Sequence, residues 1–166
     1  MKNESRNGIR LIETDEQLKA CVELLRDAFG PIAIEFGLTQ ENCPSNGAFI
    51  DYGRLKTSMN KGVIIYGVYN DEQLLGCIGL KQKDKVTYEL SKLAVLTSVR
   101  SKGIGAKLVE FACTTAGNKG GHFIKLGLID GNNVLKEWYQ LQGFKITKTK
   151  TFKHLPFKVC FMLKEV

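Results

Sequence analysis

A short segment from Arg100 to Gly105 has the residue types of an anion-binding loop. It reads R-S-K-G-I-G and lies between an apolar, strand-like stretch and an apolar-periodic helix. Glycines lack Cβ atoms and so let a phosphate approach the backbone, and the N–H groups that begin a helix carry partial positive charge. Arg100 and Lys102 add formal charge. The segment predicts a phosphate site, with an ordinary turn into a helix as the alternative.

Sequence motifs of several other chemistries are absent. The chain has no G-x-x-x-x-G-K-[ST] loop, no H-E-x-x-H, no G-x-S-x-G, and no G-x-G-x-x-G after a strand. Its two histidines, His122 and His154, are not in metal-ligand spacing. We therefore expect neither a metalloenzyme nor a Ser-His-Asp hydrolase, and no metal cofactor.

The net charge of +7 over 166 residues is unevenly distributed. Residues 1–60 hold 7 Lys/Arg against 9 Asp/Glu, whereas residues 61–166 hold 17 against 8. A basic segment of this kind suits an anionic ligand such as a phosphorylated cofactor, nucleic acid or a membrane surface. A merely solvated basic surface is the alternative.

Cysteine usage and hydropathy indicate the compartment. The five cysteines are widely spaced, odd in number and without a C-x-x-C pair, so reduced thiols fit better than disulfides or a zinc site. Residues 1–8 are polar, and no apolar run is long enough to span a bilayer. The sequence therefore predicts a cytoplasmic protein without membrane contact.

Hydrophobic periodicity predicts one α/β domain over residues 9–166, after a polar tail of residues 1–8. A capping box at Thr14 and Gln17 starts a helix that Gly30-Pro31 should end. The order of elements indicates a mixed, mostly antiparallel sheet of about six to seven strands with helices on both faces. The expected strands are residues 8–12, 63–69, 74–80, 86–95, 123–129, 146–151 and 158–164, and the later helices are residues 48–59, 104–115 and 134–141.

Two sequence blocks resemble those of the GCN5-related N-acetyltransferase (GNAT) superfamily. The first runs from about Tyr88 to Ala116 and contains E-L-S-K-L-A-V followed by the R-x-x-G-x-G segment. The second, N-x-x-x-x-x-x-Y-x-x-x-G-F, runs from Asn132 to Phe144. The resemblance implies a sheet whose central parallel strands, residues 86–95 and 123–129, splay apart. It also implies an acetyl-CoA-dependent N-acetyltransferase.

The resemblance further implies a site for acetyl-CoA as co-substrate. Backbone groups of Leu93, Ala94 and Val95 would pair with its pantetheine arm like an added strand. Asn132 matches a cofactor-contacting asparagine, and Tyr139 matches the tyrosine that commonly faces the sulfur of coenzyme A. The pyrophosphate would be held by Arg100, Ser101, Lys102, Gly103, Ile104, Gly105 and Ala106.

Acetyl transfer to a primary amine needs a base and an acid. An amine with a pKa of about 10.4 is mostly protonated at neutral pH and must lose a proton before it attacks the thioester directly, in a ternary complex. Glu89, on the predicted cofactor strand, is the candidate base, and Tyr139 is the candidate proton donor to the departing thiolate. The alternatives are a solvent-facing carboxylate for Glu89 and an aromatic packed beside Trp138 for Tyr139.

The resemblance places the acceptor site in residues 29–60 and 147–158. Glu35, Glu41 and Asp51 could attract a cationic amine, and His154 is a second candidate base. We expect a small primary amine as acceptor. A protein or peptide acceptor and a non-catalytic acyl-CoA-binding regulatory module stay open as alternatives. No nucleic-acid recognition motif is present, so no nucleic-acid partner is expected. We expect a homodimer through the apolar-rich edge offered by residues 158–164.

Overall fold

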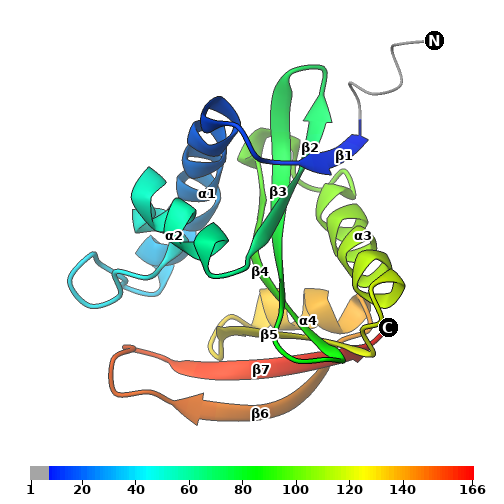
Figure 1. The fold of residues 1–166 in the computed structure, drawn as a ribbon. Coiled ribbons are helices and arrows are strands. Elements are labelled where there is room, and N and C mark those ends of the chain that lie inside the picture. The colour runs from blue at the N-terminus through cyan, green and yellow to red at the C-terminus, as the bar shows by residue number, and fades with distance from the viewer. Residues whose placement is uncertain (1–7) are drawn as a thin grey trace.

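The computed structural model describes residues 8–166, in which helices cover both faces of a seven-stranded sheet (Figure 1). The strands are β1 (Gly8–Leu11), β2 (Ile64–Asn70), β3 (Gln73–Gln82), β4 (Thr87–Val95), β5 (Phe123–Ile129), β6 (Lys145–Thr151) and β7 (Lys158–Glu165). The helices are α1 (Asp15–Glu35), α2 (Tyr52–Asn60), α3 (Ile104–Asn118) and α4 (Asn133–Leu141), with short 3-10 turns η1 (Gly47–Phe49) and η2 (Thr97–Val99).

The strand order in the sheet is β1-β2-β3-β4-β5-β7-β6. The pair β4 and β5 is parallel, and every other neighbouring pair is antiparallel. This confirms the predicted mixed sheet and its central parallel pair. Of the predicted polar tail, residues 1–7 lie outside the described residues, and Gly8 already belongs to β1.

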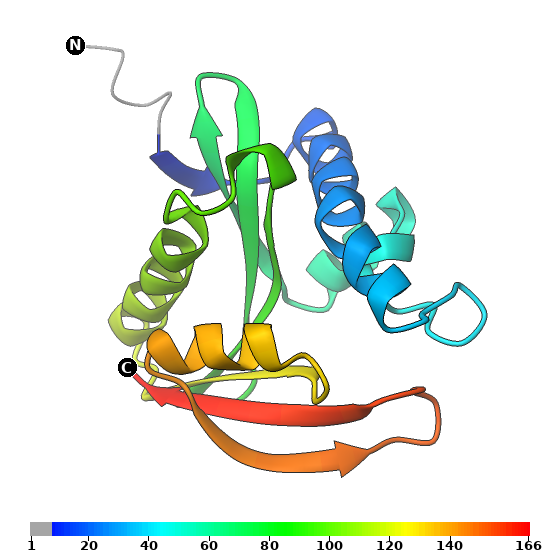
Figure 2. The ribbon, with the colours of Figure 1, turned by 180° about the vertical axis from the view of Figure 1, so that it is seen from behind.

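The sheet separates two apolar layers. On one face, α3 and α4 bury residues such as Leu108 and Tyr139 against the strands. On the other face, α1 and α2 bury residues such as Leu18 and Leu55. Figures 1 and 2 show α1 and α2 on one side of β2, β3 and β4, with α3 on the opposite side. Burial of apolar area on both faces is what fixes the central strands in place.

The first helix begins as expected and ends later than expected. Thr14 Oγ1 accepts a hydrogen bond from the Gln17 N–H at 3.2 Å, and Gln17 Oε1 accepts one from the Thr14 N–H at 3.0 Å, which confirms the capping box. The predicted end at Gly30-Pro31 is wrong, because α1 continues through Pro31 to Glu35. Ala33 is buried in a cluster with Leu38 and Cys43, so tertiary packing outweighs the hydrogen bond that the proline removes.

Two other expectations need correction. The helix predicted at residues 48–59 starts at Tyr52, because the Asp51 carboxylate accepts from the Arg54 N–H at 2.8 Å and caps it there. The strand predicted at residues 158–164 is no sheet edge. As β7 it pairs with β5 on one side and with β6 on the other, so the edge expected to support a homodimer is absent.

All five cysteines are buried, unpaired thiols. Among residues 8–166, no helix combines the length and apolar character needed to traverse a bilayer.

Candidate active site

The parallel strands β4 and β5 separate after three residues. Pairing covers Thr87–Glu89 of β4 and Phe123–Lys125 of β5. Beyond that point β5 stays paired with β7 up to Ile129, whereas β4 runs on to Val95 beside β3 alone. Backbone groups of β4 that face β5 are therefore open in the middle of the sheet. Leu93, Ala94 and Val95, the residues predicted to bind pantetheine, lie in this open part of β4.

A bulge in β4 accompanies this separation. Between the pairs Cys77–Ala94 and Gly79–Ser91, β3 has one residue and β4 has two, Lys92 and Leu93. Lys92 takes a left-handed φ of 55°, which is uncommon for a side-chain-bearing residue. The Cys77 thiol donates to the Lys92 carbonyl at 3.3 Å. An extra residue of this kind bends and twists a strand, which accounts for the divergence of β4 from β5.

The Lys92 side chain is half-buried beside α1 and β3. Burial lowers its pKa, and the nearby Cys21, Cys77 and Glu89 act in the opposite direction. A hydrogen bond with Cys21, together with burial, raises the pKa of the Cys77 thiol well above its ordinary value. Lys92 is therefore a partly buried cation near Cys21 of α1 and Cys77 of β3, and it was not among the predicted site residues.

The predicted phosphate loop leads into the start of α3. Gly103 caps the helix in a left-handed conformation with φ of 79°, and no side chain caps the first turn. The N–H groups of Ile104, Gly105 and Ala106 thus lack intrahelical partners. Ser101 also has a left-handed φ, of 66°, and Ser101, Lys102 and Gly103 are exposed. Free N–H donors at the positive end of a helix suit phosphate oxygens.

Arg100 has a structural role that its motif position does not reveal. Its guanidinium donates to the Ala28 carbonyl of α1 at 3.2 Å and to the Val95 carbonyl of β4 at 3.5 Å. These bonds hold the loop against two other elements. The residue remains exposed, so it can still offer charge to a ligand at the loop.

Gly105 lies where α3 and α4 approach each other closely. A Cβ atom on Gly105 would be 3.3 Å from Cζ2 of Trp138 and 3.8 Å from Cγ2 of Val95. A larger side chain at this position would displace the indole ring. The sequence reading missed Trp138 as a neighbour of the loop, although it adjoins Tyr139 in the second matched block.

Tyr139 projects from α4 into the apolar layer. Only 5% of it is exposed, and its ring makes edge contacts with Trp138 and Phe144 at centroid distances of 5.0 and 5.5 Å. Burial raises the pKa of its phenol far above the ordinary value of 10.0. Its hydroxyl has no hydrogen-bond partner within residues 8–166. Tyr139 is therefore a neutral phenol with a free donor.

Asn132 is a helix cap as well as a candidate cofactor contact. It is 8% exposed, and its Oδ1 accepts from the Leu135 N–H at 3.2 Å at the start of α4. Asparagine is among the favoured residues at this position, which is the signal that could have revealed the cap. Its side-chain NH₂ group is left for a second partner.

Glu89 lies on the other face of the sheet from Tyr139. Its neighbours in sequence, Tyr88 and Leu90, pack with the α3 layer, so the alternation of a strand directs Glu89 toward the α1 and α2 side. It is half-buried and stands in register with Lys81 of β3 and Lys125 of β5. Glu89 and Tyr139 thus approach the opening between β4 and β5 from opposite faces.

The two segments predicted to form the acceptor site pack together. Ala33, Leu38 and Cys43 form a buried cluster with Leu155 and Phe157 of the β6–β7 loop. The three predicted carboxylates are separate and dissimilar: Glu35 and Glu41 are exposed, whereas Asp51 caps α2. His154 is exposed in the same loop, with its ring 5.7 Å from that of Phe152.

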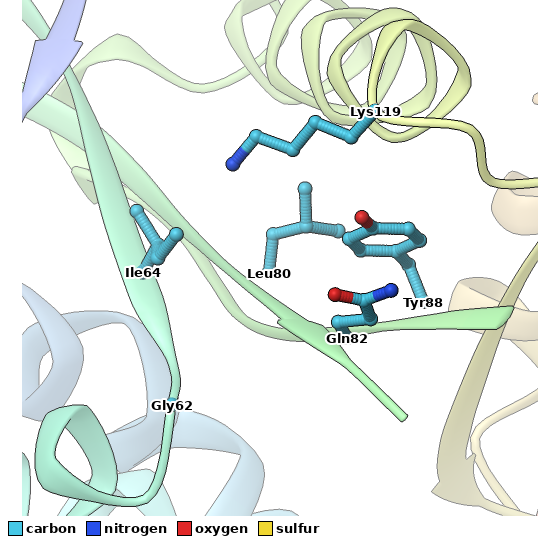
Figure 3. A pocket seen from close by; sticks show the side chains of 6 residues that line it. All are labelled: Gly62, Ile64, Leu80, Gln82, Tyr88 and Lys119. Carbon is cyan, nitrogen blue, oxygen red and sulfur yellow. The ribbon is translucent and has the colours of Figure 1, made fainter. Parts of the chain in front are cut away.

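A pocket of about 300 Å³ lies elsewhere, at the end of α3 remote from the glycine loop (Figure 3). Its apolar floor is formed by Ile64 and Leu80, with Tyr88 beside them and Lys119 above. None of the predicted site residues lines it. We take as the candidate site the opening between β4 and β5 together with the start of α3, because the predicted cofactor-binding residues lie there.

Known proteins are similar to this chain in sequence and fold. Residues 16–144 match the model of the acetyltransferase (GNAT) family. An uncharacterised N-acetyltransferase of Mycobacterium tuberculosis (strain H37Rv) is 32% identical over 84 residues, which are 51% of this chain and 54% of that protein. The match thus spans about half the length of that curated relative.

Two solved structures resemble almost the whole fold. The ribosomal-protein-S18-alanine N-acetyltransferase of Escherichia coli superposes with a TM-score of 0.75 at 14% identity, over 96% of this chain and 94% of that one. The PaiA N-acetyltransferase of Thermoplasma acidophilum, solved with coenzyme A, superposes with a TM-score of 0.73 at 21% sequence identity. The superposition covers 95% of this chain and 99% of that one. At these low sequence identities, the similarity shows a shared fold and nothing about shared substrates.

Proposed function

Since the chain belongs to the acetyltransferase (GNAT) family, we propose that it is an acetyl-CoA-dependent N-acetyltransferase whose acceptor is a small primary amine. The observation that carries the proposal is the combination of an unpaired edge of β4 with an uncapped start of α3. An open strand edge suits amide groups in an extended arm, and a free helix N-terminus suits phosphates. Acetyl-CoA contains both and supplies an activated acetyl thioester.

The residues of this chain fit such a co-substrate. Leu93, Ala94 and Val95 present backbone groups along the open part of β4. The N–H groups from Gly103 to Ala106 and the exposed Ser101 and Lys102 would hold the pyrophosphate, with Arg100 adding charge. Asn132 caps α4 with its oxygen and can offer its NH₂ group to the ligand.

Proton handling is assigned to Glu89 and Tyr139. The Glu89 carboxylate would accept the proton of the acceptor ammonium, directly or through a water, from the α1 and α2 side. The Tyr139 phenol, kept neutral by burial, would donate a hydrogen bond to the departing sulfur from the other face. Because the two groups lie on opposite faces of one opening, Glu89 can deprotonate the attacking amine while Tyr139 stabilises the departing thiolate.

Support for a small acceptor comes from the packing on the acceptor side. The α1–α2 loop and the β6–β7 loop contact each other through Leu38, Cys43 and Phe157. A wall made of two joined loops favours a compact acceptor over a long peptide groove. The exposed carboxylates Glu35 and Glu41 on this side suit a cation.

The test is thiol release from acetyl-CoA with a panel of amino acids, polyamines and drug-like amines, beside peptides with free N-termini. Glu89→Gln and Tyr139→Phe should each lower turnover by about ten- to a thousandfold, and Glu89→Gln should leave the affinity for acetyl-CoA unchanged. The control is Glu165→Gln, which makes the same carboxylate-to-carboxamide change at an exposed residue at the end of β7 and should leave turnover unchanged.

Faster turnover of peptides than of every amine would refute the small acceptor. Tight binding of acetyl-CoA without turnover of any acceptor would instead favour a non-catalytic, acyl-CoA-binding module.

A further inference from the structure

The hairpin of β6 and β7 is strongly basic. Residues 145–164 contain six lysines and no Asp or Glu. Within residues 8–166 the ion pair found joins Lys136 to Asp130, outside this hairpin. Lys164 donates to the Gln142 carbonyl at 2.8 Å, and the other hairpin lysines, Lys145, Lys148, Lys150, Lys153 and Lys158, have no carboxylate partner in the described part of the chain.

The strand β6 is an open edge of the sheet. It pairs with β7 alone, and all seven of its residues are exposed. Figures 1 and 2 show β6 as the outermost strand, beyond β7 and with no element outside it. The backbone N–H and C=O groups on its outer side are therefore free to pair with another strand.

Three lysines of β6 share one face of the sheet. Lys145, Lys148 and Lys150 stand opposite Leu163, Phe161 and Val159 of β7, and the bulge between Ile146 and Lys148 keeps them on the same side. The other face of β7, with Cys160 and Met162, packs into the α3 and α4 layer. Lys148 and Lys150 are two residues apart, which is about 7 Å along a strand.

The arrangement of the lysines discriminates between occupants of this edge. A second copy of the chain pairing edge to edge would bring lysines opposite lysines, which is destabilising. A single-stranded nucleic acid would need open aromatic faces on which its bases stack, whereas a duplex would contact the lysines through its phosphates alone and is tested below. Lys148 lies over the Phe161 ring at 5.5 Å and Lys150 over the Phe152 ring at 4.9 Å, so those faces are covered.

An extended peptide with carboxylates at alternate positions fits both features of the edge. Its backbone can pair with β6, and its alternate side chains repeat at about 7 Å, the spacing of Lys148 and Lys150. We infer that β6 is a docking strand for an acidic, extended segment of a partner protein. Lys148 and Lys150 lie within residues 147–158, one of the two segments expected to form the acceptor site, but peptide docking at the outer edge of β6 requires no acetyl transfer.

The test is fluorescence anisotropy of a labelled peptide, (Glu-Thr)₄, titrated with the full chain at 50 mM NaCl. Saturable binding is expected. Lys148→Glu/Lys150→Glu should weaken it at least tenfold, and Lys148→Ala/Lys150→Ala should also weaken it. The matched control is Lys83→Glu/Lys85→Glu, which makes the same charge change at the same spacing in the exposed β3–β4 turn and should bind as the unmodified chain does.

Two further probes separate strand pairing from mere charge attraction. A peptide N-methylated at alternate residues should lose binding, because it cannot complete the backbone ladder. A duplex RNA of similar charge should bind more weakly than the peptide. The inference would be overturned if the peptide did not bind, or if the control variant lost as much affinity as the Lys148/Lys150 variant. It would also be overturned if the methylated peptide bound or if the RNA bound more tightly than the peptide.

Discussion

At the scale of single residues, the buried phenol of Tyr139 should make the stability of the fold depend on pH in the alkaline range. Burial raises the pKa of its phenol, so the folded chain keeps the proton at pH values where the unfolded chain, with a tyrosine pKa of 10.0, has lost it. Stability is therefore fully present below pH 10 and falls as pH rises above it, by up to about 1.4 kcal/mol per pH unit. Tyr139→Phe should flatten this alkaline decline, measured by urea unfolding at pH 8 and pH 11. An equal decline in both proteins would contradict the assignment.

Asn132 shows how a motif residue can have two roles. Its Oδ1 caps α4, so Asn132→Ala should cost about 1 kcal/mol of unfolding free energy. Asn132→Asp keeps an acceptor for the Leu135 N–H and should be nearly as stable as the unmodified chain, while losing the NH₂ donor for the ligand. Denaturant unfolding beside acetyl-CoA titration separates the two roles. Equal affinity for the ligand in both variants and the parent would exclude a cofactor contact.

The sequence block that contains Asn132 and Tyr139 predicts a cofactor contact and a proton donor, and both roles stay predictions. It did not predict that Arg100 bonds to the carbonyls of Ala28 in α1 and Val95 in β4, because Ala28 is 72 residues away in the sequence and the bond to Val95 depends on how the loop folds back. Such bonds depend on tertiary arrangement, whereas the motif records only residue types and spacing.

At the scale of elements, α1 tests how packing competes with local preference. Pro31 is exposed inside the helix and lacks the N–H that its turn requires. Pro31→Ala should raise the unfolding free energy by about 1 to 3 kcal/mol, since proline costs about 3 kcal/mol in a helix interior. Urea unfolding measures this. A less stable variant would mean that the proline bend is needed to seat Ala33 among Leu38 and Cys43.

Helices and strands with a strong hydrophobic periodicity could be predicted from the sequence, whereas the register and order of the strands in the sheet could not. The strand at residues 123–129 was predicted with its observed bounds because it is a short apolar run between turn signals. The bulge at Lys92 depends on the offset between β3 and β4, and a left-handed lysine has no signature in the sequence. The outer position of β6 likewise depends on β7 entering between β5 and β6.

At the scale of the whole molecule, the excess positive charge lies in the half that contains the phosphate loop and the β6–β7 hairpin. If phosphate binding at the start of α3 uses this charge, the dissociation constant of acetyl-CoA should rise severalfold between 50 and 500 mM NaCl, because salt screens exposed charges. Titrations at the two salt concentrations measure this. An unchanged constant would mean that uncharged contacts dominate.

The homodimer stays a prediction at this scale, without the edge first expected to support it. The lysines of β6 oppose self-pairing at that edge. A dimer mass in light scattering that Lys148→Glu/Lys150→Glu leaves unchanged would place the interface elsewhere.

The most direct test of the proposed site is a calorimetric titration of acetyl-CoA into the chain and two glycine variants. We predict one-to-one binding that Gly105→Glu abolishes, because its side chain would meet Trp138 beside the loop. Gly117→Glu makes the same change on the same helix, where a Cβ atom has open space, and should bind normally. No binding to the parent chain, or equal binding in both variants, would contradict the placement of acetyl-CoA between β4, β5 and the start of α3.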